Sequence, residues 1–143
     1  MKSETSPDAV VDGPAPIRVL VVDDEAAVCR FAARVLSGAG YLVETASNGP
    51  EALDIVQNAG AFDLFVIDEM MPDMRGRELA GELRQRQPDA KVLYYTGNLD
   101  LLLQDTNVFV ENEAVLAKPV SVDGLREAVA RLLSDPTRDP AAG

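Results

Sequence analysis

Residues 65–76 read FVIDEMMPDMRG, an apolar run that ends in a carboxylate and continues into a loop with proline and glycine. The carboxylate is Asp68. A buried strand that ends in an acidic residue carries it to the rim of a sheet, whereas an ordinary surface carboxylate lies on a solvated face. Asp68 is therefore the first candidate for a functional group.

Three other apolar runs also end in polar residues. Asp23 and Asp24 follow residues 19–22, Thr96 follows residues 91–95, and Lys118 follows residues 114–117. Parallel strands bring their carboxyl ends to one edge of a sheet, where ligands bind. We therefore predict that these side chains and Asp68 form one site.

The apolar pattern alternates between strands and helices. It predicts strands at residues 17–22, 42–46, 63–68, 91–95 and 115–117, and helices at residues 25–39, 50–58, 75–86, 99–105 and from Ser121 onward. The helix at 99–105 has no clear apolar face, and residues 106–110 look almost strand-like. Five strands alternating with five helices indicate an α/β fold with a parallel sheet covered on both faces.

The length and composition are those of one domain, which we expect at residues 17–133 between flexible tails at 1–16 and 134–143. We therefore expect no additional output domain. The net charge of −11 argues against nucleic-acid binding. We expect a cytoplasmic protein, because no segment has the pattern of a signal peptide or a membrane span.

The chain has no histidine and one cysteine. The absence of histidine excludes Ser-His and Cys-His catalysis, imidazole metal sites and a phosphohistidine carrier within this chain. Cys29 falls in the first predicted helix, where we expect a small core residue without a redox role.

The five polar side chains suit phosphoryl chemistry. Three carboxylates that converge need a cation to stay ionised together, and ligands that are all oxygen favour Mg²⁺ or Mn²⁺. Lys118 and Thr96 would bind an anionic oxygen. One aspartate could then attack phosphorus and form an acyl phosphate.

These residues resemble, as an ordered set, the signature of two-component receiver domains, the phosphoacceptor modules of response regulators. The motifs are Asp23-Asp24-Glu25, Asp68 through Met71-Pro72 and Gly76, Thr96-Gly97, and Lys118-Pro119, and the resemblance covers residues 17–133. It implies a flavodoxin-like (βα)5 fold with strand order 2-1-3-4-5, and a signalling domain that catalyses only its own phosphorylation and dephosphorylation.

The resemblance also implies a role for each residue. Asp68 would be the phosphoacceptor. Asp24, Asp68 and the carbonyl of Met70 would hold Mg²⁺, with Asp23 acting mainly through water. Thr96, Lys118 and the backbone N–H groups of Glu69 and Gly97 would contact the phosphoryl oxygens. The Lys118-Pro119 peptide bond would be cis.

One position departs from the family pattern. Receivers usually carry an aromatic residue three positions before the lysine, and here that residue is Val115. Tyr94, Tyr95 or Phe109 could substitute for it. We expect residues 97–110 to carry the conformational change on phosphorylation.

Three functions remain open. The first is a stand-alone receiver whose phosphorylation changes its partner binding. The second is an aspartate-nucleophile phosphatase, although such enzymes carry a second Asp two residues after the nucleophile, where Glu25 or Met70 stands here. The third is a receiver fold kept as a binding or dimerisation surface.

The resemblance names a class of partner. Without a histidine of its own, the chain would receive the phosphoryl group from a sensor histidine kinase or a histidine phosphotransfer protein. A downstream protein target and a homodimer are both compatible with the sequence, and no nucleic-acid or membrane partner is expected.

Overall fold

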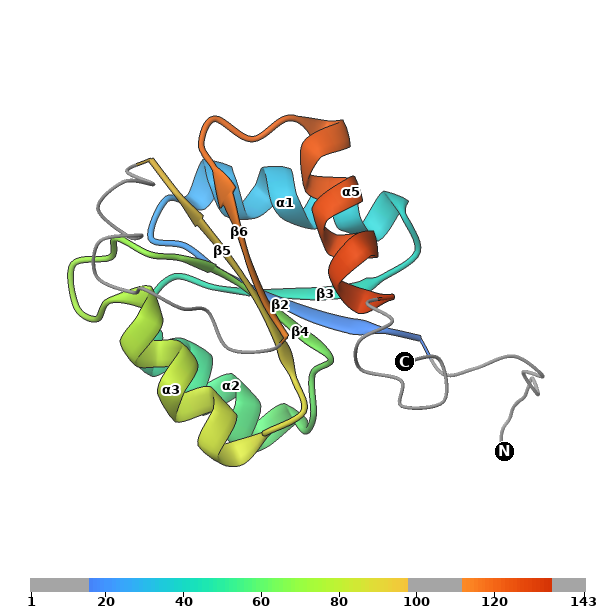
Figure 1. Cartoon of the computed structure of the whole chain (residues 1–143). Coiled ribbons are helices and arrows are strands. Elements are labelled where there is room, and N and C mark those ends of the chain that lie inside the picture. Colours follow the sequence, from blue (N-terminus) through green and yellow to red (C-terminus); the bar gives the residue numbers. More distant parts are fainter. Residues whose placement is uncertain (1–15, 98–111, 135–143) are drawn as a thin grey trace.

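The computed structural model describes residues 16–97 and 112–134. Within these residues one parallel sheet is formed by five strands: β2 (Arg18–Val22), β3 (Leu42–Ala46), β4 (Leu64–Asp68), β5 (Lys91–Thr96) and β6 (Glu113–Ala117). Their order across the sheet is β3-β2-β4-β5-β6 (Figure 1). This confirms the doubly wound flavodoxin-like sheet with order 2-1-3-4-5.

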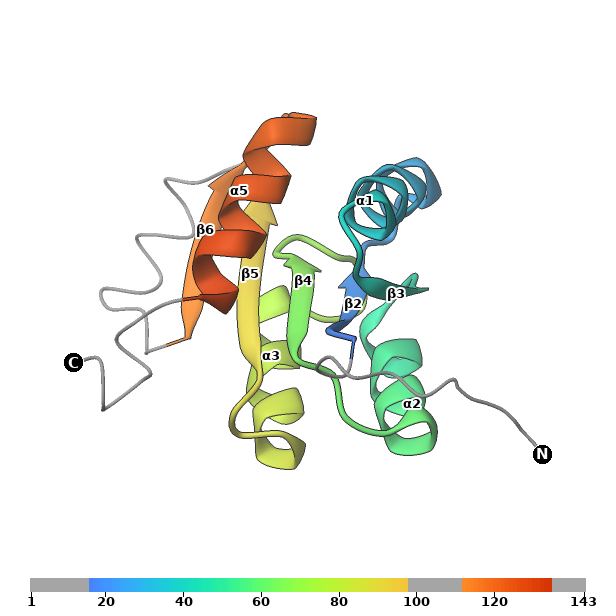
Figure 2. The same cartoon turned by 90° about the vertical axis from the view of Figure 1, so that its right-hand side faces the viewer.

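Helices cover both faces of the sheet. In the described residues α1 (Ala26–Gly38) and α5 (Val122–Leu133) lie on one face, and α2 (Gly49–Ala59) and α3 (Gly76–Arg86) lie on the other (Figures 1 and 2). The predicted helix at 99–105, the strand-like residues 106–110 and most of both predicted tails lie outside the described residues.

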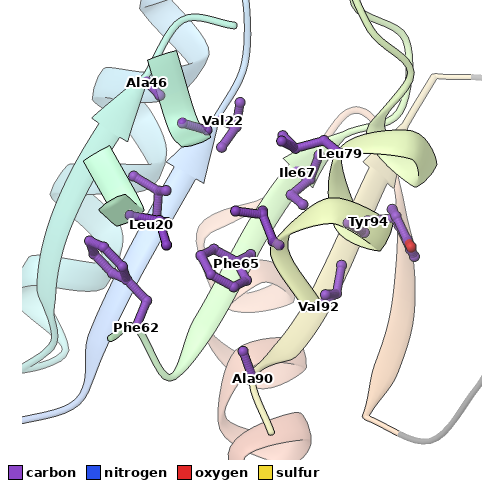
Figure 3. Close-up of a cluster of buried hydrophobic side chains, with 14 of the residues drawn as sticks. Leu20, Val22, Ala46, Phe62, Phe65, Ile67, Leu79, Ala90, Val92 and Tyr94 are labelled. Carbon is purple, nitrogen blue, oxygen red and sulfur yellow. The ribbon is translucent and has the colours of Figure 1, made fainter. Parts of the chain in front are cut away.

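Each strand supplies side chains to two cores. Leu20 of β2 belongs to the core under α2 and α3, whereas its neighbour Val21 belongs to the core under α1 and α5. This follows from the alternation of side chains along a strand, and it explains why the strands read as continuous apolar runs. Figure 3 shows the first of these cores, where Phe65 and Ile67 of β4 pack with Leu20 and Leu79.

Local sequence signals fix several helix starts. The Asn48 side chain accepts the N–H of Glu51 at the start of α2, and Pro50 lies in that first turn. Ser121 caps α5 as expected, because its hydroxyl accepts the N–H of Gly124 at 2.9 Å. Cys29 is buried in α1, as predicted.

The predicted boundaries need small corrections. β5 includes Thr96, and β6 begins at Glu113 rather than at residue 115. The Glu113 carboxylate accepts a hydrogen bond from the Tyr94 hydroxyl at 3.1 Å and lies 3.6 Å from Arg84. These tertiary contacts hold the polar residue Glu113 in β6. A hydrophobic pattern in the sequence cannot reveal that the strand begins at a polar residue.

The register of the sheet determines which residues lie side by side at the carboxyl ends of the strands. Val22 of β2 pairs with Ile67 of β4, so the residues that follow each of them leave the sheet side by side. The chain reverses its direction of winding between these two strands, which makes this edge the topological switch point. No helix among the described residues is both long enough and apolar enough to cross a membrane.

Candidate phosphoacceptor site

Three carboxylates meet at the switch point. Asp23, Asp24 and Asp68 each offer an oxygen, and these oxygens lie within 4.8 Å of one another. Asp23 and Asp68 are buried and Asp24 is exposed. The structure thus brings together the three acidic residues that the sequence singles out, two of them sheltered and one open to water.

Lys118 provides the cation next to these carboxylates. Its Nζ lies 3.4 Å from Oδ1 of Asp68 and 3.5 Å from Oδ2 of Asp23. The Lys118 N–H also donates to the carbonyl of Thr96 at 2.8 Å, which ties the lysine to the end of β5. The Lys118-Pro119 peptide bond is cis, as expected. The ammonium therefore compensates part of the negative charge of the cluster.

Hydrogen bonds from backbone amides orient two of the carboxylates. Oδ1 of Asp23 accepts the N–H of Glu25 at 2.7 Å, and Oδ1 of Asp68 accepts the N–H of Met70 at 3.2 Å. Burial raises the pKa of Asp68 to about 6, with a further contribution from the Asp23 charge, while Lys118 and the Met70 N–H act in the opposite direction. Asp68 is therefore still mostly ionised at neutral pH.

A cavity of about 290 Å³ opens over the cluster. Its lining consists of Asp24, Glu25, Asp68, Met70, Gly97 and Lys118. Among the described residues, a Cβ built on Gly97 would meet no atom within 4 Å. A phosphoryl-sized group can reach Asp68 through this cavity, past Asp24 and Gly97.

The donor set fits a hard divalent cation. The cluster offers only carboxylate oxygens, and the exposed Asp24 leaves room for water ligands, as Mg²⁺ requires. The thiol of Cys29 does not compete as a ligand, because its Sγ donates to the carbonyl of Asp23 at 3.3 Å and burial raises its pKa to about 11. The site can therefore hold a metal through Asp23, Asp24 and Asp68.

Thr96 and the backbone amide of Glu69 both lie at the end of the sheet. Thr96 is fully buried at the end of β5, where it pairs in register with Ala117. The Glu69 N–H, for which we expect a contact with the phosphoryl group, donates to the carbonyl of Tyr95 at 3.2 Å in this structure, and its role toward a phosphoryl group stays a prediction. The sheet continues by one hydrogen bond beyond Asp68, and the amide that donates to the Asp68 carboxylate is that of Met70.

Tyr95, one of the aromatic residues that the sequence offers as a substitute at the switch, lies next to the site. The Lys118 Nζ lies 5.0 Å from the centre of its ring. Its buried hydroxyl makes no hydrogen bond of ordinary geometry with the described residues, and burial together with the nearby Asp23 charge raises its pKa strongly. The Tyr95 ring thus lies within the distance of a cation–π contact with the Lys118 ammonium.

Two side chains near the acceptor were not predicted from the sequence. The Glu69 carboxylate is buried, and Arg75 reaches it from the surface. Their spacing of six positions across a loop carries no recognisable helical or strand signal. The burial of an acidic residue directly after a strand can be predicted only if a basic residue is known to contact it in the folded protein.

Comparison with known proteins agrees with this geometry. The family model of the response regulator receiver domain matches residues 19–130. The response regulator MprA of Mycolicibacterium vanbaalenii is 35% identical over 128 residues, which cover 90% of this chain and 55% of MprA. The chain thus spans about half the length of this relative.

Two further matches cover nearly whole proteins. The response regulator receiver protein CpdR of Brucella abortus is 31% identical over 116 residues, which cover 81% of this chain and 96% of CpdR. The response regulator TrrA of Thermotoga maritima, solved in complex with Mg²⁺-BeF, is 36% identical with a TM-score of 0.70, covering 81% of this chain and 98% of that one. Together with the acidic cluster, the lysine and the sheet order, these matches show that the chain belongs to the response regulator receiver domain family.

Proposed function

We propose that this chain accepts a phosphoryl group on Asp68 from a phosphohistidine of a partner protein, and that the modification changes which protein it binds. The observation that carries this proposal is the position of the Lys118 ammonium, 3.4 Å from the Asp68 carboxylate and within the same acidic cluster as Asp24. An isolated structural aspartate would not need a cation, two further acids and an open cavity around it.

The transfer follows from the groups present. A carboxylate oxygen of Asp68 attacks phosphorus, the P–N bond to the imidazole of the donor breaks, and its electron pair leaves with the imidazole. Lys118 neutralises charge on the phosphoryl oxygens, and the Met70 N–H lies beside the acceptor carboxylate. Mg²⁺ bound by Asp23, Asp24 and Asp68 would add electrostatic stabilisation of the transferring group. The roles of the Met70 carbonyl, the Thr96 hydroxyl and the Gly97 N–H are part of this proposal.

The absence of histidine bears on the class of protein that donates the phosphoryl group. These 143 residues contain no histidine, so none of them can serve as the phosphohistidine donor. We therefore propose a sensor histidine kinase or a histidine phosphotransfer protein as the donor. Family membership supports the same class of donor. Phosphotransfer profiling against the histidine kinases of the source genome would identify the donor by its rate.

The direct test uses a small-molecule donor. Wild-type protein with acetyl phosphate and Mg²⁺ should gain one phosphoryl group in intact-mass spectra, and beryllofluoride should shift the amide resonances around Asp68. Asp68→Asn or excess chelator should abolish both effects. Labelling that survives Asp68→Asn would refute the assignment, and a wild type that responds to neither reagent would favour the binding-module function.

A second measurement tests the output. Affinity capture or size-exclusion chromatography with and without beryllofluoride should show a change in the bound partner, whether a target protein or a second copy of this chain. An identical profile in both states would contradict a phosphorylation-dependent interaction.

A further inference from the structure

A second buried carboxylate lies directly after the acceptor. Glu69 is 1% exposed, although a lone glutamate in a loop ordinarily lies in water. Its side chain belongs to none of the metal or phosphoryl contacts assigned above. Burying this charge is costly unless it is paired and hydrogen-bonded, so its contacts indicate its role.

The contacts of Glu69 reach forward to the start of α3. Oε2 accepts Nε of Arg75 at 2.9 Å and Nη2 of the same guanidinium at 2.5 Å. Oε1 accepts the backbone N–H of Arg77 at 3.0 Å. The carboxylate thus satisfies one of the free amides at the helix start and lies at the positive end of the helix dipole. A residue in the preceding loop performs the function of an N-cap.

The backbone of the loop closes at the same point. The Gly76 N–H donates to the Glu69 carbonyl at 2.9 Å. A Cβ on Gly76 would lie 2.6 Å from the carbonyl oxygen of Asp68 and 2.9 Å from Cα of Glu69, so no side chain fits there. The loop therefore returns against the acceptor residue itself, and we call the contacts of Glu69 with Arg75, Gly76 and Arg77 the Glu69 clamp.

The residue held by this closure is Met70. It lies between Glu69 and the rest of the loop, its N–H donates to Oδ1 of Asp68, and it lines the cavity. A shift of its backbone would move both that amide and the carbonyl proposed as a metal ligand. Groups that orient metal ligands typically change metal affinity about 10- to 100-fold when removed.

We propose that the Glu69 clamp is a positioning device that fixes the backbone of Met70 for metal binding and phosphoryl transfer at Asp68. This inference rests on the proposed function. Glu69 and Arg75 touch neither the metal nor the phosphoryl group, and they act through the loop.

Charge and geometry predict opposite results when Arg75 alone is changed. Removal of its positive charge leaves the Glu69 carboxylate unpaired near the acidic cluster, which by Coulomb attraction would strengthen Mg²⁺ binding. Loss of the Glu69 clamp would instead weaken Mg²⁺ binding. The sign of the change in Arg75→Met therefore separates the two effects.

The main test uses a double substitution that leaves the net charge unchanged. Glu69→Leu with Arg75→Met removes the side-chain clamp without leaving a buried charge. We expect the Mg²⁺ dissociation constant, measured by NMR titration, to rise about tenfold or more, and the Met70 amide to exchange faster with deuterium. Phosphorylation by acetyl phosphate should require more Mg²⁺ but still occur at Asp68.

A control removes a more exposed ion pair at the other end of the sheet. Arg18 and Glu44 form an ion pair at 3.1 Å, and Arg18→Met with Glu44→Leu should lower stability without changing the Mg²⁺ dissociation constant. If the main variant does not fold, Arg75→Lys keeps the charge but loses the two-donor geometry, and a weaker Mg²⁺ affinity is again expected.

The outcomes are distinguishable. If the wild type binds Mg²⁺ and is phosphorylated while the double variant and Arg75→Lys bind Mg²⁺ equally well, the clamp has no positioning role. Tighter binding by Arg75→Met would show that Arg75 acts by charge alone and would also overturn the inference. If the wild type neither binds Mg²⁺ nor accepts a phosphoryl group, the proposed function itself fails.

Discussion

The Lys118 ammonium lies between Asp23 and Asp68, 3.5 Å from one carboxylate and 3.4 Å from the other. The two acids come from neighbouring strands and are both buried. One partly exposed cation therefore compensates two sheltered charges, and the metal-free site retains an excess of negative charge. This imbalance governs how the site responds to pH, metal and substitution.

Asp68→Asn should stabilise the metal-free protein at neutral pH. The pKa of Asp68 is raised from 3.8 to about 6 in the folded state, so above pH 6 the folded protein carries a charge that the unfolded chain accommodates more easily. The gain should be roughly 1–2 kcal/mol, because the open cavity admits water that offsets part of the cost of burial.

The pH dependence provides the check. Below the unfolded pKa both states are protonated and the cost is absent, so the advantage of Asp68→Asn should shrink as pH falls from about 7 to about 4. Urea unfolding in chelator across this range measures it, with exposed Asp89→Asn as the control. A constant difference across the range would contradict the raised pKa.

Mg²⁺ affinity should fall as pH drops through 6. A protonated Asp68 cannot serve as an anionic ligand, and burial raises its pKa to about 6. NMR titrations with Mg²⁺ at several pH values would measure the change. Asp24→Asn should weaken binding at every pH while leaving the unfolding free energy nearly unchanged, because Asp24 is exposed.

Lys118→Ala should fold but lose most phosphorylation. Without the ammonium the buried carboxylates repel each other, so the metal-free variant should lose roughly 2 kcal/mol of stability, less than a fully buried pair would cost. Added Mg²⁺ should restore much of this loss. Thermal unfolding with and without Mg²⁺, together with acetyl phosphate labelling, tests both statements, and wild-type labelling would argue against a role for Lys118.

Tyr94→Phe and Tyr95→Phe should have opposite effects on stability. The Tyr94 hydroxyl donates to Glu113 at 3.1 Å, so its removal should cost about 1 kcal/mol. The Tyr95 hydroxyl is buried without such a bond among the described residues, so its removal should be neutral or stabilising. Urea midpoints of the two variants compare them directly, and equal losses would indicate a hydrogen bond at Tyr95.

The sequence predicted the sheet and the acidic cluster because both depend on local patterns. Apolar runs reveal strands, and Asp23, Asp24, Asp68 and Lys118 lie where those runs end. The environment of Glu69 could not be predicted in this way. Its burial depends on Arg75 folding back across a loop, and the same closure places the Met70 amide, instead of the Glu69 amide, beside the acceptor.

The contacts around Asp68 also differ in their separation along the chain. The Glu69 clamp joins residues six to eight positions apart, whereas the contact of Lys118 with Asp23 joins residues 95 positions apart. Short loops close in about 10–100 ns, and distant contacts form later because their closure costs more entropy. We therefore expect the loop after Asp68 to close early in folding, and the Lys118 ammonium to reach the site only when β6 has joined the sheet. If Lys118 is required for phosphoryl transfer, as proposed, only chains that have finished folding would be phosphorylated.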